Sequence, residues 1–226
     1  MSNWSDRGIR GGGQGLATNV DHMNIKTVII FVVVTLGVLL GVGGLLWQFG
    51  SQADKPVVDI AADKHHVMGN GANTLVEFSD FQCPACLAVQ APLREILKKY
   101  EGKIEFVYRF FPLVSIHKNA QMSAQAAEAA SMQGKFWEMH DKLFATQGEW
   151  AEITDPKEKF GTYADELGLD KAKFMTDMDS QQARDAINVD LLATTRYRMT
   201  GTPTFYLNGA KIEFSQIEPK LVELTK

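Results

Sequence analysis

The stretch FSDFQCPACLAVQ, residues 78–90, contains both cysteines of a 226-residue chain, Cys83 and Cys86. Two residues lie between them. A cysteine pair with this spacing can hold a metal, form a structural cross-link or undergo reversible oxidation as a dithiol. The elements that the flanking sequence predicts favour one of these three uses.

The sequence predicts a strand before the cysteines and a helix after them. Residues 74–78 (TLVEF) form a short apolar run that is typical of a buried strand. Residues 84–100 carry apolar side chains at helical spacing, and Gly102 follows as a terminator. Residues 104–111 (IEFVYRFF) predict a second strand, and the order strand, helix, strand is typical of a parallel βαβ unit.

A block of helices is predicted next. Helical periodicity or a helix start occurs at four places: residues 119–132 with Asn119 as a candidate cap, 136–144, from Asp155-Pro156 onward, and from Ser180 to about 198. The period then becomes that of strands. Residues 203–207 lead into Asn208-Gly209, which favours a two-residue hairpin turn, and 211–214 complete the hairpin. Residues 215–225 are expected to form a last helix.

Segment 27–49 is unlike the rest because its 23 residues carry no charge. A helix of that length, rising about 1.5 Å per residue, crosses a bilayer core of about 30 Å. We expect an uncleaved membrane anchor, with 1–26 as a disordered cytoplasmic N-terminus and 50–70 as a linker. A signal peptide cleaved after Ala53 is the alternative. Both readings place the folded domain, 71–226, outside the cytoplasm, periplasmic or extracellular, where cysteine pairs oxidise.

Composition and histidine spacing exclude two classes of site. The formal net charge is −4, the isoelectric point is near 5.7 and no Lys/Arg-rich run occurs, so we expect no nucleic-acid partner. The His65-His66 pair of the linker is interpreted as solvated surface, because no further ligand lies at a zinc spacing.

The redox use of the cysteines fits best. A structural zinc site commonly takes four ligands, and the chain has no second cysteine pair. A cross-link over two intervening residues closes a very short loop and stabilises little. A dithiol between a strand and a helix, however, places Cys83 at the helix N-terminus, where amide dipoles favour a thiolate. Pro84 suits the first helical turn, where no hydrogen bond is lost.

Two motifs carry a family resemblance. VEFSDFQCPAC at 76–86, together with GTPTFYLNGAKI at 201–212, resembles the thioredoxin-fold disulfide oxidoreductases. FFPLVSIHKNAQMSAQAAEAA at 110–130 resembles the start of the helical insert of their DsbA-like branch. The resemblance covers roughly 70–226. It implies an α/β thioredoxin fold with an inserted helical domain at about 115–198, and no metal or organic cofactor.

The resemblance also implies residue roles. Cys83 matches the family's exposed nucleophile and Cys86 its buried resolving thiol. Glu77 matches a buried acid on the preceding strand, which exchanges a proton with the second thiol. Pro203 matches the cis-proline that faces the cysteines, and Thr202 is the residue before it. Thr202, Pro84 and Ala85 are implied to contact substrate.

The direction of electron flow stays open at this point. Pro84-Ala85 lacks the histidine of strongly oxidising members, and Asp80 adds negative charge nearby unless it points to solvent; both favour a less oxidising disulfide. An oxidase, a reductase and an isomerase are all compatible with the sequence, and a non-catalytic or metal-binding adaptor is the alternative of another class. The implied partners are exported proteins with cysteine thiols and a quinone-linked membrane reoxidase.

Overall fold

The structure is a computed structural model, and it describes residues 25–50, 60 and 65–226. The expected disordered N-terminus lies outside the described residues except for its last two positions, as do most of the linker and the alternative cleavage site at Ala53. The chain divides into two units, Met1–Ala53 and Asp54–Lys226, which are treated separately below.

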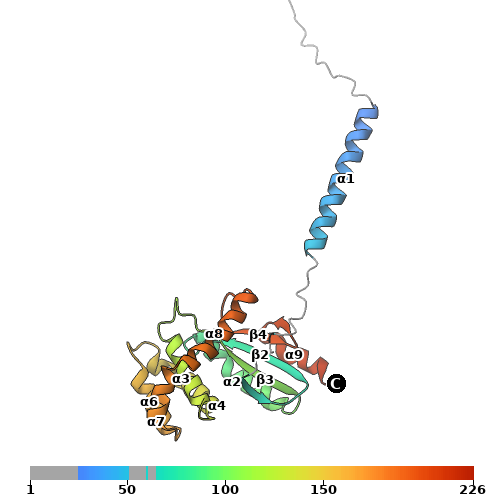
Figure 1. Ribbon diagram of the computed structural model, residues 1–226. Coiled ribbons are helices and arrows are strands. Elements are labelled where there is room, and N and C mark those ends of the chain that lie inside the picture. The colour runs from blue at the N-terminus through green and yellow to red at the C-terminus, as the bar shows by residue number, and fades with distance from the viewer. Residues whose placement is uncertain (1–24, 51–59, 61–64) are drawn as a thin grey trace, which may run out of the picture. The chain divides into compact units, whose positions relative to one another are not determined.

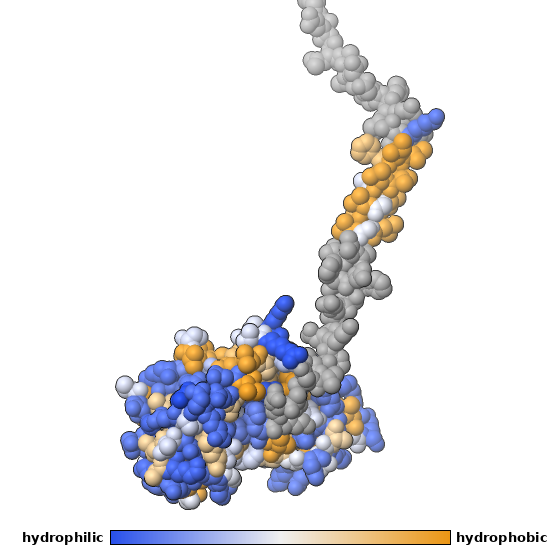
Figure 2. All heavy atoms as spheres, viewed as in Figure 1, coloured by the Kyte–Doolittle hydropathy of each residue, from blue (hydrophilic) through white to orange (hydrophobic). Residues whose placement is uncertain are grey.

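The first unit contains one described helix, α1, at Ile25–Gly50. In this helix the structure describes the side chains of Lys26 and of residues 29–42. The side chains of residues 29–42 are exposed and mostly apolar, as Figure 2 shows. No helix within the described residues is both long enough and apolar enough to cross a membrane.

The second unit is built on a five-stranded sheet with strand order β1-β3-β2-β4-β5, of which β2, β3 and β4 are labelled in Figure 1. The strands are β1 at His66–Gly69, β2 at Asn73–Ser79, β3 at Ile104–Phe110, β4 at Thr204–Leu207 and β5 at Ala210–Ile212. β2 and β3 are parallel and are joined through helix α2, Pro84–Lys99, which confirms the predicted βαβ unit. The remaining neighbours pair antiparallel.

Six helices follow one another in the fully described stretch between β3 and β4. They are α3 at Ala120–Ser131, α4 at Phe136–Ala145, α5 at Gln147–Trp150, α6 at Lys157–Glu166, α7 at Lys171–Met178 and α8 at Gln181–Arg196. Figure 1 shows α3, α4, α6 and α7 gathered beside the sheet, and α8 contacts both α3 and β3. The sequence did not predict α5 or α7. A final helix, α9, covers Phe214–Leu224.

The predicted hairpin turn is confirmed at the end of β4. Asn208 and Gly209 both have positive φ, 51° and 80°, as a two-residue turn of this type requires. The Asn208 amide N–H also donates to the Thr74 carbonyl at 2.8 Å, which joins the turn to the start of β2.

The expected linker boundary at residue 70 is wrong. His66–Gly69 is an edge strand that pairs antiparallel with β3, and the His66 side chain is only 2% exposed. Its ring stacks on Phe136 at 3.6 Å between centroids, and its Nε2 lies 3.0 Å from Glu128. The four residues lack a strand's alternating pattern, so their burial arises from contacts with distant residues rather than from local sequence.

The sheet separates two apolar clusters. Leu75, Phe106 and Tyr108 belong to the cluster that also contains α2 and the insert helices. Val76, Phe78 and Val107 belong to the cluster on the opposite face. Successive side chains of a strand point to opposite faces. Glu77 therefore lies on the face that carries α2, a question that its sequence neighbours left open.

A buried ion pair joins the insert to the sheet. Arg109 on β3, 2% exposed, donates from Nε to Asp190 on α8 at 2.6 Å and from Nη1 to the Ile60 carbonyl at 2.8 Å. The other Asp190 oxygen accepts from the Phe110 amide at 2.7 Å. Both charges are thus paired and hydrogen-bonded, which burial of an ion pair requires.

Replacing Asp190 with alanine should destabilise the folded domain by about 3–5 kcal/mol, because the Arg109 charge would stay buried without its partner. Denaturant unfolding of the full-length protein measures this change. Asp185→Ala is the control, since Asp185 lies on the same helix but is exposed. That variant should stay within about 0.5 kcal/mol of the wild type. Equal losses in both variants would contradict the role given to the ion pair.

Candidate functional site

The site is built at the turn from β2 into α2. The Cys83 amide donates to the Asp80 carbonyl at 3.0 Å, which closes the turn. Cys83 is the N-cap residue of α2, with extended backbone angles of φ −73° and ψ 122°. Pro84 begins the helix, where a missing N–H costs nothing. The sequence therefore places the cysteine pair over the first turn of α2, as predicted.

Cys83 is less exposed than expected. Its residue is 7% exposed, whereas Pro84 and Ala85 beside it are exposed. Both cysteines have free thiols in the structure. Cys83 Sγ lies 3.7 Å from the Thr202 carbonyl oxygen. The loop before β4 therefore covers the sulfur on the side opposite the helix, which accounts for its low exposure.

The environment of Cys83 favours its thiolate. Its pKa is lowered to about 5, chiefly by hydrogen bonding from the Cys86 thiol. Burial acts against this shift, while the Thr202 side chain and the backbone amides of Cys86 and Ala85 act with it. These amides belong to the first turn of α2, whose unpaired N–H groups stabilise an anion.

Cys86 lies in the opposite environment. It is fully buried, and burial raises its pKa, with further increases from Cys83 and from the charge of Glu77. One thiol of the pair thus ionises easily and the other hardly at all. This asymmetry is what a nucleophile and a resolving thiol need.

Glu77 is fully buried on β2, beneath the cysteines. Its Oε1 accepts from Gln90 Nε2 at 3.1 Å, and the same nitrogen lies 3.2 Å from the Cys86 carbonyl oxygen. Burial raises the pKa of Glu77 to about 7, and the neighbouring Ser79 hydroxyl and Gln90 amide offset part of this rise. Within the described residues Oε2 makes no hydrogen bond. Gln90 therefore joins the buried acid to the backbone of the second cysteine, a link that sequence reasoning missed.

The peptide bond between Thr202 and Pro203 is cis, as predicted. It lies in the loop just before β4, and β4 pairs with β2, the strand that leads to the cysteines. The sheet pairing therefore brings Thr202 to Cys83 although the two residues are 119 positions apart.

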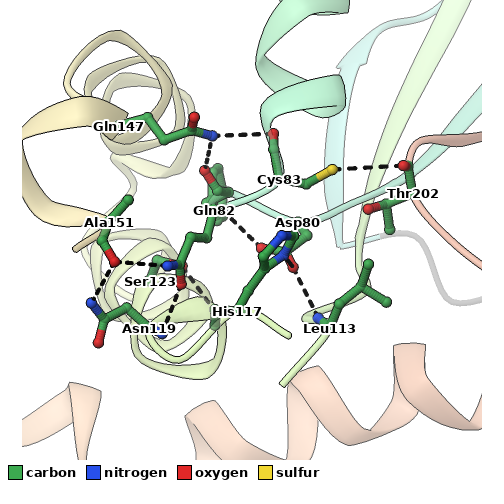
Figure 3. A network of polar contacts seen from close by, with 12 residues as sticks. Asp80, Gln82, Cys83, Leu113, His117, Asn119, Ser123, Gln147, Ala151 and Thr202 are labelled. Carbon is green, nitrogen blue, oxygen red and sulfur yellow. Dashed lines mark hydrogen bonds and ion pairs between the residues drawn. The ribbon is translucent and has the colours of Figure 1, made fainter. Parts of the chain in front are cut away.

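The Asp80 side chain is buried and does not point to solvent. A solvent-facing Asp80 was the one case in which its charge was not expected to make the disulfide less oxidising. Asp80 is 2% exposed, and its oxygens accept from the Gln82 amide at 2.7 Å and the Leu113 amide at 2.9 Å (Figure 3). His117 Nδ1 lies 2.7 Å from Oδ2. The carboxylate thus holds the turn before Cys83 and the loop after β3 together.

The insert contacts the same turn through amide side chains (Figure 3). Gln82 donates to the Ala151 carbonyl at 2.7 Å and accepts from the Asn119 amide at 2.7 Å. Gln147 on α5 donates to the carbonyls of Phe81, at 2.8 Å, and Cys83, at 3.1 Å. No local pattern in the sequence marks these glutamines, because their partners lie 37 to 69 positions away.

The role expected for Asn119 is wrong. It precedes α3 as predicted, but its side chain makes no capping hydrogen bond. Instead Nδ2 lies within hydrogen-bond distance of the carbonyls of Trp150, Ala151 and Ile153, at 3.2, 3.0 and 2.9 Å. The side chain thus adds to the partners of this segment, where the Trp150 carbonyl also accepts from the Ile153 amide and the Ala151 carbonyl from Gln82.

The described part of the chain contains no group of three or more His, Cys, Asp or Glu side chains placed to hold a metal ion. The fold does bring Glu77 close to the cysteine pair, since the charge of Glu77 raises the pKa of Cys86 after the larger effects of burial and of Cys83.

Three comparisons place the chain among known proteins. Residues 61–224 match the family model described as thioredoxin. The chain is 38% identical over 157 residues to the Na(+)/H(+) antiporter NhaA 3 of Salinispora tropica, a match that covers 69% of this chain and 23% of that protein. The chain thus spans about a quarter of the length of the curated relatives it matches.

Two solved structures share the fold. A thioredoxin-like oxidoreductase from Silicibacter pomeroyi has a TM-score of 0.61 at 26% identity, covering 74% of this chain and 96% of that one. The thiol-disulfide exchange protein alpha-DsbA2 from Wolbachia pipientis has a TM-score of 0.62 at 20% identity, covering 74% and 90%. These structures share the thioredoxin-like fold of this chain. With the family match extending over most of its length, the chain belongs to the thioredoxin family.

Proposed function

We propose that this protein introduces or exchanges disulfides in exported proteins through a Cys83–Cys86 couple. The observation that carries the proposal is the opposed environment of the two thiols. The pKa of Cys83 is lowered to about 5, whereas burial raises that of Cys86. A sulfur whose thiolate is stable is a good leaving group, so mixed disulfides at Cys83 are readily released.

The exchange proceeds in two displacements. A substrate thiolate attacks Cys83 Sγ, the Cys83–Cys86 bond breaks, and Cys86 leaves and takes up a proton. The substrate's second thiolate then attacks the substrate sulfur of the mixed disulfide, and Cys83 departs as a thiolate. Two substrate thiols are oxidised to one disulfide, and the protein's disulfide is reduced to a dithiol.

Glu77 is the proposed source of the proton for Cys86. Its pKa of about 7 keeps a large fraction of the carboxyl protonated at neutral pH. Its described hydrogen bond goes to Gln90 rather than to the Cys86 sulfur. The proposed proton transfer from Glu77 to Cys86 therefore passes through one intervening water.

The proposed substrate surface surrounds the sulfur of Cys83. Pro84 and Ala85 are exposed on one side of it, and Thr202 lies on the other with its carbonyl 3.7 Å from Sγ. Backbone groups beside a reactive sulfur can pair with an extended peptide without reading its sequence. This arrangement supports a protein substrate of broad sequence.

The proposed direction is oxidation. Stabilising the Cys83 thiolate stabilises the dithiol form and so raises the reduction potential of the couple. A pKa near 5 lies between about 3.5 for a strongly oxidising member of this fold and about 7 for a reducing one. A partner must then reoxidise the protein, and we propose a quinone-linked membrane enzyme.

We further propose that the uncharged segment 27–49 anchors the chain in the cell membrane as a single span, with a cytoplasmic N-terminus and the domain outside. Alkaline extraction of membranes from cells that express the full-length chain tests the anchor. Recovery of the protein in the soluble fraction would contradict it.

Replacing Cys86 with serine should trap substrates on Cys83, because Cys86 can then no longer attack the mixed disulfide and release the substrate, while the serine hydroxyl can still donate a hydrogen bond to Cys83. Mixed disulfides with exported proteins should appear on non-reducing gels and vanish on reduction. Cys83→Ser is the matched control and should trap none. Absence of complexes in the first variant, or equal amounts in both, argues against the assigned roles.

The reduction potential of the couple should lie between about −270 mV, the value for thioredoxin, and about −120 mV, the value for DsbA. Equilibration with glutathione buffers measures it. A value at or below about −270 mV would make the protein a reductase. Tight metal binding that needs both cysteines, with no exchange activity, would favour the adaptor alternative.

Replacing Glu77 with glutamine should stabilise the protein at high pH only. The wild-type pKa of about 7 exceeds the ordinary value of 4.5. Below pH 4.5 Glu77 is protonated in both the folded and the unfolded state, so its titration does not change the free energy of unfolding. As pH rises from 4.5 to about 7, the carboxyl ionises more easily in the unfolded state, and the wild type loses stability. The variant should be more stable than the wild type by up to about 3 kcal/mol at pH 8, and similar to it at pH 4.

Denaturant unfolding at the two pH values measures this difference, and the exposed Glu95→Gln on α2 is its control. The Glu77 variant should also resolve mixed disulfides more slowly, while Cys83 is alkylated at the wild-type rate. A pH-independent difference between the Glu77 variant and the wild type would show that Glu77 does not titrate in this range.

A further inference from the structure

We infer that Gln147, on helix α5 of the insert, is a positioning residue that sets the ionisation of Cys83. The inference rests on the proposed function, because it concerns the reactivity of the same thiol. Gln147 is 7% exposed, and its Nε2 donates to the carbonyls of Phe81 at 2.8 Å and Cys83 at 3.1 Å. Figure 3 shows the side chain reaching from the insert to the start of α2.

The Cys83 carbonyl connects Gln147 to the backbone conformation of Cys83. The Leu87 amide donates to it at 3.1 Å from within α2, and Gln147 donates to it from the insert. The plane of the peptide group after Cys83 is therefore held from two sides. That plane is tied to the ψ angle of Cys83, which at 122° is extended rather than helical.

The ψ angle of Cys83 determines which backbone amides of α2 lie near the Cys83 sulfur. The Cys86 thiol has the largest effect in lowering the pKa of Cys83, and the backbone amides of Cys86 and Ala85 lower it further, because the N-cap conformation turns their N–H groups toward its sulfur. A rotation of the N-cap peptide would turn the helix start away from Sγ. Gln147 opposes such a rotation from the insert, through its hydrogen bond to the Cys83 carbonyl.

The rest of the turn is held independently. Asp80 accepts from the Gln82 amide, and Gln82 bridges to Ala151 and Asn119. Loss of Gln147 would therefore leave the turn attached to the insert and release mainly the Phe81 and Cys83 carbonyls. The thiolate should then change more than the fold does.

The test is Gln147→Met in the full-length reduced protein, which keeps the length of the side chain and removes its donors. Thiolate absorbance and the alkylation rate are followed against pH. The pKa of Cys83 should rise by about one unit, so the thiolate fraction below that pKa falls about tenfold. The equilibrium constant with glutathione should shift toward the disulfide by a similar factor, because the dithiol form loses its thiolate stabilisation.

Gln125→Met is the matched control. Gln125 is also an insert glutamine, and it donates to the Met178 carbonyl at 2.9 Å, away from the turn. Its variant should keep the wild-type pKa of Cys83. An unchanged pKa in Gln147→Met, or the same shift in both variants, would overturn the inference.

Two further outcomes are decisive. If Gln147→Met does not fold, Gln147→Asn takes its place, and failure of both to fold assigns Gln147 to structure alone and overturns the inference. If the wild type shows no exchange activity but the pKa shift is found in Gln147→Met only, the positioning role stands and the proposed function fails.

Discussion

The start of α2 is the constraint on which the site depends. Cys83 must cap the helix, with an extended backbone, so that the first amides of the helix reach its sulfur. Pro84 makes that start sharp, because it fits the first helical position and cannot continue a strand. β2 lies at the centre of the sheet and delivers Cys83 to this point, and β4 brings Thr202 to the other side of the sulfur.

Burial then separates the behaviour of the two thiols. One helical turn divides them, yet one lies against the helix amides and the other in the apolar interior. Glu77 lies below the second thiol and Tyr108 is nearby; burial raises the pKa of both, and the charge of Glu77 raises that of Cys86. A low dielectric thus favours neutral groups in the interior, while the thiolate of Cys83 is stabilised at the first turn of α2.

The insert belongs to the site as well as to the fold. Arg109 and Asp190 attach α8 to β3, and the amide side chains of Gln82 and Gln147 attach the turn before Cys83 to the segment around α5. The carbonyls of Phe81 and Cys83 in this turn accept hydrogen bonds from Gln147 of the insert. An added helical block of this kind can change the reactivity of a thiol without changing the motif that contains it.

The sequence alone determined the features that local patterns encode: the strand and helix around the cysteines, the position of the cysteine pair at the start of that helix, and the Asn208-Gly209 turn. The tertiary structure decided the rest. It placed His66 in the sheet, Glu77 on the α2 face, Asp80 away from solvent and Gln147 against the Cys83 carbonyl. Each depends on partners many positions away, such as Gln147, which lies 64 positions after Cys83. Burial and hydrogen bonding at that range arise from packing, which no short stretch of sequence contains.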